Sequence, residues 1–155
     1  MTINDKVFGE LDYQYTWVGY RTIKFLGKDT EIALLIGGED DGKFDEGQYV
    51  AYNSIMDNWE KIQHNILQPI LNYYKQKRHE LGYDVACNED YPSIKTVDQL
   101  IEHITLVGIS VPYDFLRDGR DVGVSFDCSW NEENGLGIRL INEKVDEVGY
   151  QDVAI

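Results

Sequence analysis

Residues 45–82 read DEGQYVAYNSIMDNWEKIQHNILQPILNYYKQKRHELG. Their apolar side chains recur at steps of three and four, the spacing that places them on one face of an amphipathic helix. These side chains belong to Ile55, Trp59, Ile62, Ile66, Ile70 and Tyr73. Asp45, followed three residues later by Gln48, predicts a capping box at the start of the helix. Pro69 lacks a backbone donor, so we expect either a kink over residues 65–68 or a second helix with Pro69 in its first turn.

Strand patterns flank this helical segment on both sides. Apolar and polar residues alternate with a period of two, as in half-buried strands, and turn residues separate the runs. We expect strands over 11–16, 20–26 and 30–36 before the helices, then a short helix capped by Thr96 and strands over 107–111, 121–130, 138–141 and 144–148. This order predicts one α+β domain over residues 1–155. Its mainly antiparallel sheet is built from N- and C-terminal strands, with a central pair of helices packed on one face.

The chain is strongly acidic, with 28 Asp and Glu against 14 Lys and Arg and a formal net charge of −14. Negative charge of this size repels phosphate backbones and anionic lipid surfaces, so nucleic-acid and membrane partners are not expected. The same field attracts basic proteins, which makes a basic protein the partner that the charge favours. The alternative is that the acidity serves solubility alone.

The first residues and the cysteines both favour the cytoplasm. Residues 1–6 lack the apolar core of a signal peptide, and no apolar run is long enough to span a bilayer. Cys87 and Cys128 are the two cysteines, and their spacing is neither that of a disulfide framework nor that of a redox motif. We therefore expect a cytoplasmic location.

Familiar catalytic and metal-binding motifs are missing from the sequence. His64, His79 and His103 have neither HExxH nor other zinc-ligand spacing, so no metal site is expected. Ser125 lies within an expected strand instead of at a strand-to-helix nucleophile elbow. We therefore expect no catalytic residues and no cofactor.

The loop ahead of the helical segment carries five carboxylates in the eight residues 39–46. Calcium prefers such ligands, but the spacing differs from that of an EF-hand, so a solvated loop with a helix cap is the simpler interpretation. The loop leads into two tyrosines, a residue type enriched at protein interfaces. The candidate binding residues are Asp40, Asp41, Asp45, Glu46, Tyr49 and Tyr52.

The C-terminal third carries a motif. Residues 126–139 read FDCSWNEENGLGIR and residues 145–152 read VDEVGYQD. Both stretches, together with FGEL at 8–11, resemble a family of small acidic bacterial domains of unknown function. The resemblance implies the same fold over nearly the whole chain but no activity. Asn134 stands where that family often has histidine, which argues against a metal or acid–base role at this turn.

The sequence leaves three hypotheses for function. The first is a non-enzymatic intracellular binding protein, of the immunity or inhibitor type, that neutralises a basic partner protein through an acidic and aromatic face. The second is a metal-assisted hydrolase that uses His103, Asp127 and Glu133. The third is a structural or regulatory domain that self-associates through its apolar tail, residues 153–155. We favour the first because no recognisable catalytic motif supports the second.

Overall fold

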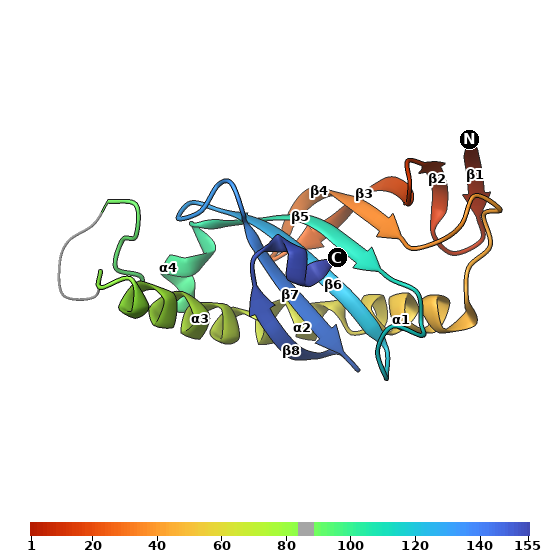
Figure 1. Cartoon of the computed structure of the whole chain (residues 1–155). Helices are drawn as coiled ribbons and strands as arrows, with labels where there is room; N and C mark the ends of the chain where they lie inside the picture. Colours follow the sequence, from red (N-terminus) through yellow and green to blue (C-terminus); the bar gives the residue numbers. More distant parts are fainter. Residues whose placement is uncertain (84–88) are drawn as a thin grey trace.

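The computed structural model describes residues 1–83 and 89–155 (Figure 1). An eight-stranded sheet runs through it, and the strands lie side by side in chain order from β1 to β8. Neighbouring strands are antiparallel except β4 and β5, which are parallel because the helices cross over between them. The fold is therefore α+β with a mostly antiparallel sheet, as predicted. The strands are β1 (Thr2–Asp5), β2 (Gly9–Tyr13), β3 (Trp17–Phe25), β4 (Lys28–Ile36), β5 (Ile104–Val111), β6 (Asp121–Cys128), β7 (Leu136–Ile141) and β8 (Lys144–Gly149).

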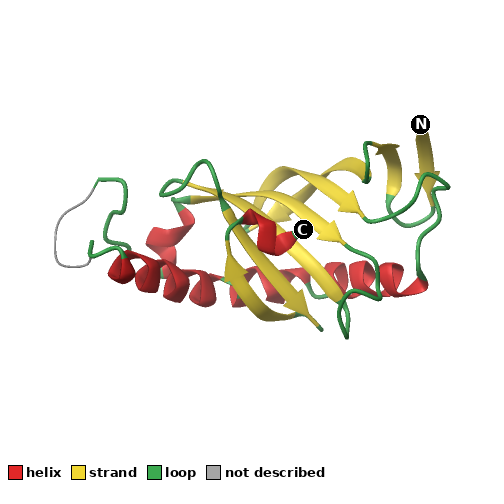
Figure 2. Cartoon of the chain, viewed as in Figure 1, coloured by secondary structure: helices red, strands yellow, loops and turns green. Residues whose placement is uncertain are grey.

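Where the sequence predicted a pair of helices, the crossover contains a row of three, α1 (Glu46–Asp57), α2 (Trp59–Asn65) and α3 (Leu67–Glu80), which run end to end (Figure 2). A short α4 (Val97–Ile101) follows and leads into β5. Pro69 lies in the first turn of α3, as the second-helix alternative predicted. The additional break comes at Asn58, whose side-chain amide donates to the Ser54 carbonyl oxygen at 2.8 Å.

Both predicted helix caps are present. The Gln48 side-chain oxygen accepts from the Asp45 backbone N–H at 2.8 Å, which is one half of the capping box. The Thr96 hydroxyl accepts from the Gln99 backbone N–H at 3.2 Å and starts α4. These caps fix the residues at which α1 and α4 begin.

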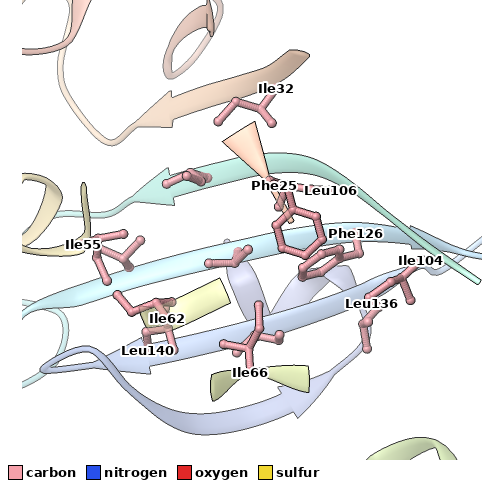
Figure 3. Close-up of a cluster of buried hydrophobic side chains, with 14 of the residues drawn as sticks. Phe25, Ile32, Ile55, Ile62, Ile66, Ile104, Leu106, Phe126, Leu136 and Leu140 are labelled. Atoms are coloured by element: carbon pink, nitrogen blue, oxygen red, sulfur yellow. The ribbon is translucent and has the colours of Figure 1, made fainter. Parts of the chain in front are cut away.

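The helical row buries its apolar face against the central strands (Figure 3). The Phe25 ring lies 5.6 Å from Phe126 and 6.3 Å from Trp59, measured between ring centroids. Ile62 and Ile66 of the predicted helical stripe are buried in the same cluster. Burial of each such side chain contributes roughly 1.5–3 kcal/mol, so this layer is the main source of stability.

The opposite face of β6 and β7 is covered by the C-terminal residues. Side chains alternate along a strand, so Gly123 of β6 and Gly137 of β7 lie on the face away from Phe126. The short 3-10 helix η1 (Gln151–Ala154) packs there, with Ala154 buried. Arg139 and Asp121 are buried beside it and form an ion pair at 2.7 Å. Part of the apolar tail that the third hypothesis offers for self-association is thus packed within the chain, although Ile155 remains exposed.

The N-terminal strands differ from the sequence prediction. The expected strand over 11–16 ends at Tyr13, because Tyr15 has a φ of 67° and turns the chain toward β3. The strand β1 was not predicted, since its four residues show no apolar alternation. Among the described helices, none combines the length and apolar character needed to cross a membrane.

Candidate functional site

The acidic loop joins β4 to α1 at one end of the sheet. The Trp17 indole N–H donates to the Glu39 carbonyl oxygen at 2.7 Å and holds the start of the loop. Asp40 and Asp41 follow and are exposed, and Glu46 is exposed in the first turn of α1. These three carboxylates are therefore in contact with solvent.

The other three candidate residues are engaged within the fold. Asp45 forms the α1 cap. Tyr49 stacks on Phe8 at 5.1 Å and its hydroxyl donates to Asp5 at 2.7 Å, while Tyr52 meets Phe8 edge to face. Burial and the hydrogen bond to Asp5 raise the pKa of Tyr49 to about 12. The structure thus uses both tyrosines to attach α1 to the turn between β1 and β2.

A second loop, residues 112–120 between β5 and β6, lies beside the acidic loop and carries exposed apolar side chains. Phe115 is 73% exposed and Leu116 is 55% exposed. The Phe115 ring stacks on Tyr113 at 5.2 Å, and the Tyr113 hydroxyl donates to the Glu39 carboxylate at 3.2 Å. We refer to residues 39–46 and 112–120 together as the acidic end. The second loop was not among the predicted binding residues, although adjacent Phe and Leu between Pro112 and the Asp118–Gly119 turn were a usable signal.

Two arginines of the second loop form ion pairs with carboxylates outside the loop. Arg117 forms an ion pair with Asp121 at 2.9 Å, and Arg120 forms one with Glu143 at 2.6 Å. The hydrogen bond and charge of Arg120 lower the pKa of Glu143. Both cations therefore face carboxylates, although Arg117 shares Asp121 with Arg139. The acidic end as a whole stays negative, because its two loops hold seven carboxylates against three Lys and Arg.

A separate hollow of about 400 Å³ lies at the opposite end of β6 and contains two residues of the hydrolase hypothesis, His103 and Asp127. The His103 Nδ1 lies 2.7 Å from the Ser129 hydroxyl, and Asp127 accepts a hydrogen bond from Gln151 at 3.2 Å. Glu132 lines the hollow in the place expected for Glu133. Within residues 1–83 and 89–155, no three His, Cys, Asp or Glu side chains are grouped to hold a metal ion.

Cys128 also borders this hollow but is a poor nucleophile. Burial raises the pKa of its thiol to about 11. A thiol with that pKa is almost fully protonated at neutral pH, and only the thiolate attacks. Cys87 lies outside the described residues.

The motif of the C-terminal third serves the packing of η1. Gly137 and Arg139 face η1, and the Gln151 side-chain amide donates to the Phe126 carbonyl oxygen at 2.8 Å. The Asn134 carbonyl oxygen accepts a hydrogen bond from the Gln151 backbone N–H at 3.0 Å. The motif therefore describes how the C-terminal residues close the second face of the sheet.

Fold and surface together define an α+β domain with an open eight-stranded sheet, one helical layer and an acidic end bearing exposed apolar residues. The chain belongs to the family described as a domain of unknown function, DUF6985, whose model matches residues 7–155. No curated protein and no solved structure matches the chain.

Proposed function

We propose that this chain is a non-enzymatic intracellular binding protein that holds a basic partner protein against its acidic end, in the manner of an immunity or inhibitor protein. The observation that carries the proposal is the exposed pair Phe115 and Leu116, set among carboxylates. Two adjacent large apolar side chains that lie mostly in water add little stability to the free domain beyond the stacking of Phe115 on Tyr113. They gain free energy when a partner covers them.

The rim around this pair supports a basic partner in particular. Residues 39–46 carry five carboxylates and one lysine, and the neighbouring arginines Arg117 and Arg120 are already paired. Protein interfaces usually have an apolar centre surrounded by a polar or charged rim. The apolar centre supplies affinity and the charged rim supplies fast association and choice of partner.

The partner is first isolated from a lysate of the source organism by affinity capture on this chain at low and at moderate salt. A captured basic protein is then identified by mass spectrometry, purified and measured against the variants below. A specific partner binds at both salt concentrations, whereas proteins held only by non-specific electrostatic attraction are released at moderate salt. If the purified basic proteins all bind with unaltered kinetics after changes at the acidic end, the proposal is wrong.

Charge reversal in the first loop, Asp40→Lys with Asp41→Lys, is expected to slow association with that partner by about 10-fold at low salt. The dissociation rate should change far less, because both side chains are exposed and belong to the rim. Stopped-flow or biosensor kinetics separate the two rates. The matched control is Glu132→Lys with Glu133→Lys, an exposed adjacent pair in the turn at the far end of β6, which should leave association nearly unchanged.

Replacement of Phe115 by alanine is expected to change the dissociation rate of the partner instead of the association rate. Removing an exposed ring leaves the free domain as stable as before, since the ring buries little surface in it. Dissociation of the partner should become about 10-fold faster or more, because aromatic anchors carry a large share of binding energy. Tyr20→Ala, which removes another exposed aromatic ring on β3, is the control. Equal effects of the two changes would contradict the placement of the interface.

A further inference from the structure

The two loops of the acidic end begin side by side, at the ends of β4 and β5. Because these strands run parallel, they end at the same edge of the sheet, with Ile36 opposite Val111. The Gly37 backbone N–H donates to the Val111 carbonyl oxygen at 2.9 Å and continues the pairing one residue beyond β4. From here one loop leads to α1 and the other leads to β6.

One buried side chain of α1 contacts both loops at this point. Gln48 is 1% exposed. Its amide nitrogen donates to the Gly37 carbonyl oxygen at 2.7 Å and to the Val111 carbonyl oxygen at 3.3 Å. Its amide oxygen accepts from the Asp45 backbone N–H at 2.8 Å. Gln48 therefore bonds the first loop at both of its ends and the second loop where it leaves β5.

These contacts need an amide in particular. The capping box at the start of α1 uses only the Gln48 oxygen, and a glutamate would serve there equally well. The two bonds from the Gln48 nitrogen go beyond what a helix cap requires, because they join the helix to two separate loops. An ionised carboxylate accepts but cannot donate, so it cannot replace these bonds. An apolar side chain of the same length would leave buried carbonyl oxygens without this donor.

The two loops meet again farther out, through weaker contacts. The Tyr113 hydroxyl donates to the Glu39 carboxylate at 3.2 Å, and the Phe115 ring stacks on Tyr113. The Tyr113 bond is exposed, so water competes for both groups and the bond alone orders the loops little. The position of Phe115 relative to the carboxylates of the first loop therefore depends on the buried bonds of Gln48.

We infer that Gln48 is a positioning residue for the acidic end, which holds the two loops in one arrangement and presents them to the basic partner as a preformed surface. The inference rests on the proposed function, because it names the residue on which the shape of that surface depends. A preformed surface spares the complex the cost of ordering two loops. The apparent affinity is proportional to the fraction of molecules that already have the binding arrangement.

The first test needs no partner and uses amide hydrogen exchange followed by NMR. Gln48→Met keeps the length of the side chain and removes the amide. We expect the Gly37 amide to exchange about 10-fold faster in this variant, measured relative to the Ser129 amide. Ser129 donates to the His103 carbonyl oxygen at 2.9 Å at the opposite end of β5 and β6, so its exchange reports the stability of the rest of the sheet.

Gln63→Met is the matched control. Gln63 is also a buried glutamine of the helical row, 2% exposed, and its side-chain oxygen accepts from the Leu26 backbone N–H at the turn that precedes β4. This variant loses a buried amide that joins a helix to a loop away from the acidic end. It should change the ratio of Gly37 to Ser129 exchange by less than about 2-fold.

Gln48→Glu separates the role in joining the loops from the role as a helix cap. At neutral pH a glutamate keeps the acceptor for the Asp45 N–H and has no donor for the Gly37 and Val111 oxygens. We expect faster Gly37 exchange in this variant too. Wild-type protection of Gly37 relative to Ser129 would show that Gln48 acts only as a cap, and would overturn the inference. Equal acceleration at both amides in the two Gln48 variants would also overturn it, because the residue would then support the whole fold.

Binding of the purified partner separates the inference from the function on which it rests. Gln48→Met should weaken the affinity about 10-fold, and Gln63→Met less than about 2-fold. If changes at Asp40, Asp41 and Phe115 weaken binding but Gln48→Met does not, the inference is wrong and the proposed function stands. If Gly37 exchange responds as expected but changes at Asp40, Asp41 and Phe115 leave every captured protein unaffected, Gln48 joins the two loops but the proposed function fails.

Discussion

Replacement of Arg139 by methionine is expected to lower the free energy of unfolding by about 3–4 kcal/mol. Arg139 and Asp121 side chains are each 2% exposed, and their ion pair measures 2.7 Å. Burial lowers the pKa of Arg139, and the charge of Asp121 opposes that shift. The cost of the change comes mainly from Asp121, which stays buried with its charge and keeps only the contact to Arg117.

The same change also releases the C-terminal residues. The second guanidinium nitrogen of Arg139 donates to the Ile155 main-chain oxygen at 3.0 Å. A urea titration measures the loss, and the melting temperature should fall by roughly 6–15 °C for a chain of this length. Replacing both partners, Arg139→Met with Asp121→Leu, should recover most of the stability, because no buried charge is left unpaired. A double variant as unstable as the single one would show that the lost contact to Ile155 dominates instead.

The sequence predicted those parts of the fold that depend on neighbouring residues. Alternating side chains located β6 and β7, the Asp45–Gln48 spacing located the start of α1, and Pro69 located the first turn of α3. Each of these signals acts within a few residues, where propensity and steric limits decide the backbone. The break between α1 and α2 at Asn58 was not predicted. The Asn58 side chain donates to the Ser54 carbonyl oxygen, and no sequence motif indicates this bond.

The candidate site was predicted only in part, because it depends on residues far apart in the chain. Asp40, Asp41 and Glu46 are exposed as expected, since a polar loop stays in water. Tyr49 was placed on a binding face, but Phe8 packs against it from 41 positions away in sequence. The Tyr113 hydroxyl reaches the Glu39 carboxylate only because the parallel pairing of β4 with β5 brings both loops to the same end of the sheet.

The sequence also did not predict that the second face of the sheet is covered. The pattern Gly123–Val124–Ser125 shows one apolar and one small polar face, which is what a solvent-exposed strand would show. Residues 150–155 cover that small face, and small residues are present because a backbone lies against them. Small residues in a row on one face of a strand therefore indicated close contact with another backbone segment.

Replacement of Gly123 by alanine is expected to displace η1 and to cost about 2–3 kcal/mol. The new Cβ atom would stand 1.8 Å from the Ala154 carbonyl oxygen, a backbone atom that cannot move without undocking the segment. Undocking removes the Gln151 bond to the Phe126 oxygen and exposes Ala154, which is fully buried. A side chain at Gly137 on β7 would also clash with this segment, since its Cβ would stand 2.4 Å from the Tyr150 carbonyl oxygen.

Gly108→Ala separates this steric effect from the general effect of adding a methyl group to a strand. Gly108 lies on β5 next to β6, and the nearest atom to its added Cβ is 3.3 Å away. We expect a change below about 1 kcal/mol there. Hydrogen exchange supplies the local readout, because the amides of Val153 and Ile155 are bonded only within the C-terminal turn and should exchange much faster in the Gly123 variant. If both variants were equally stable and equally protected at these amides, η1 would be a loosely attached end and not the second layer of the sheet.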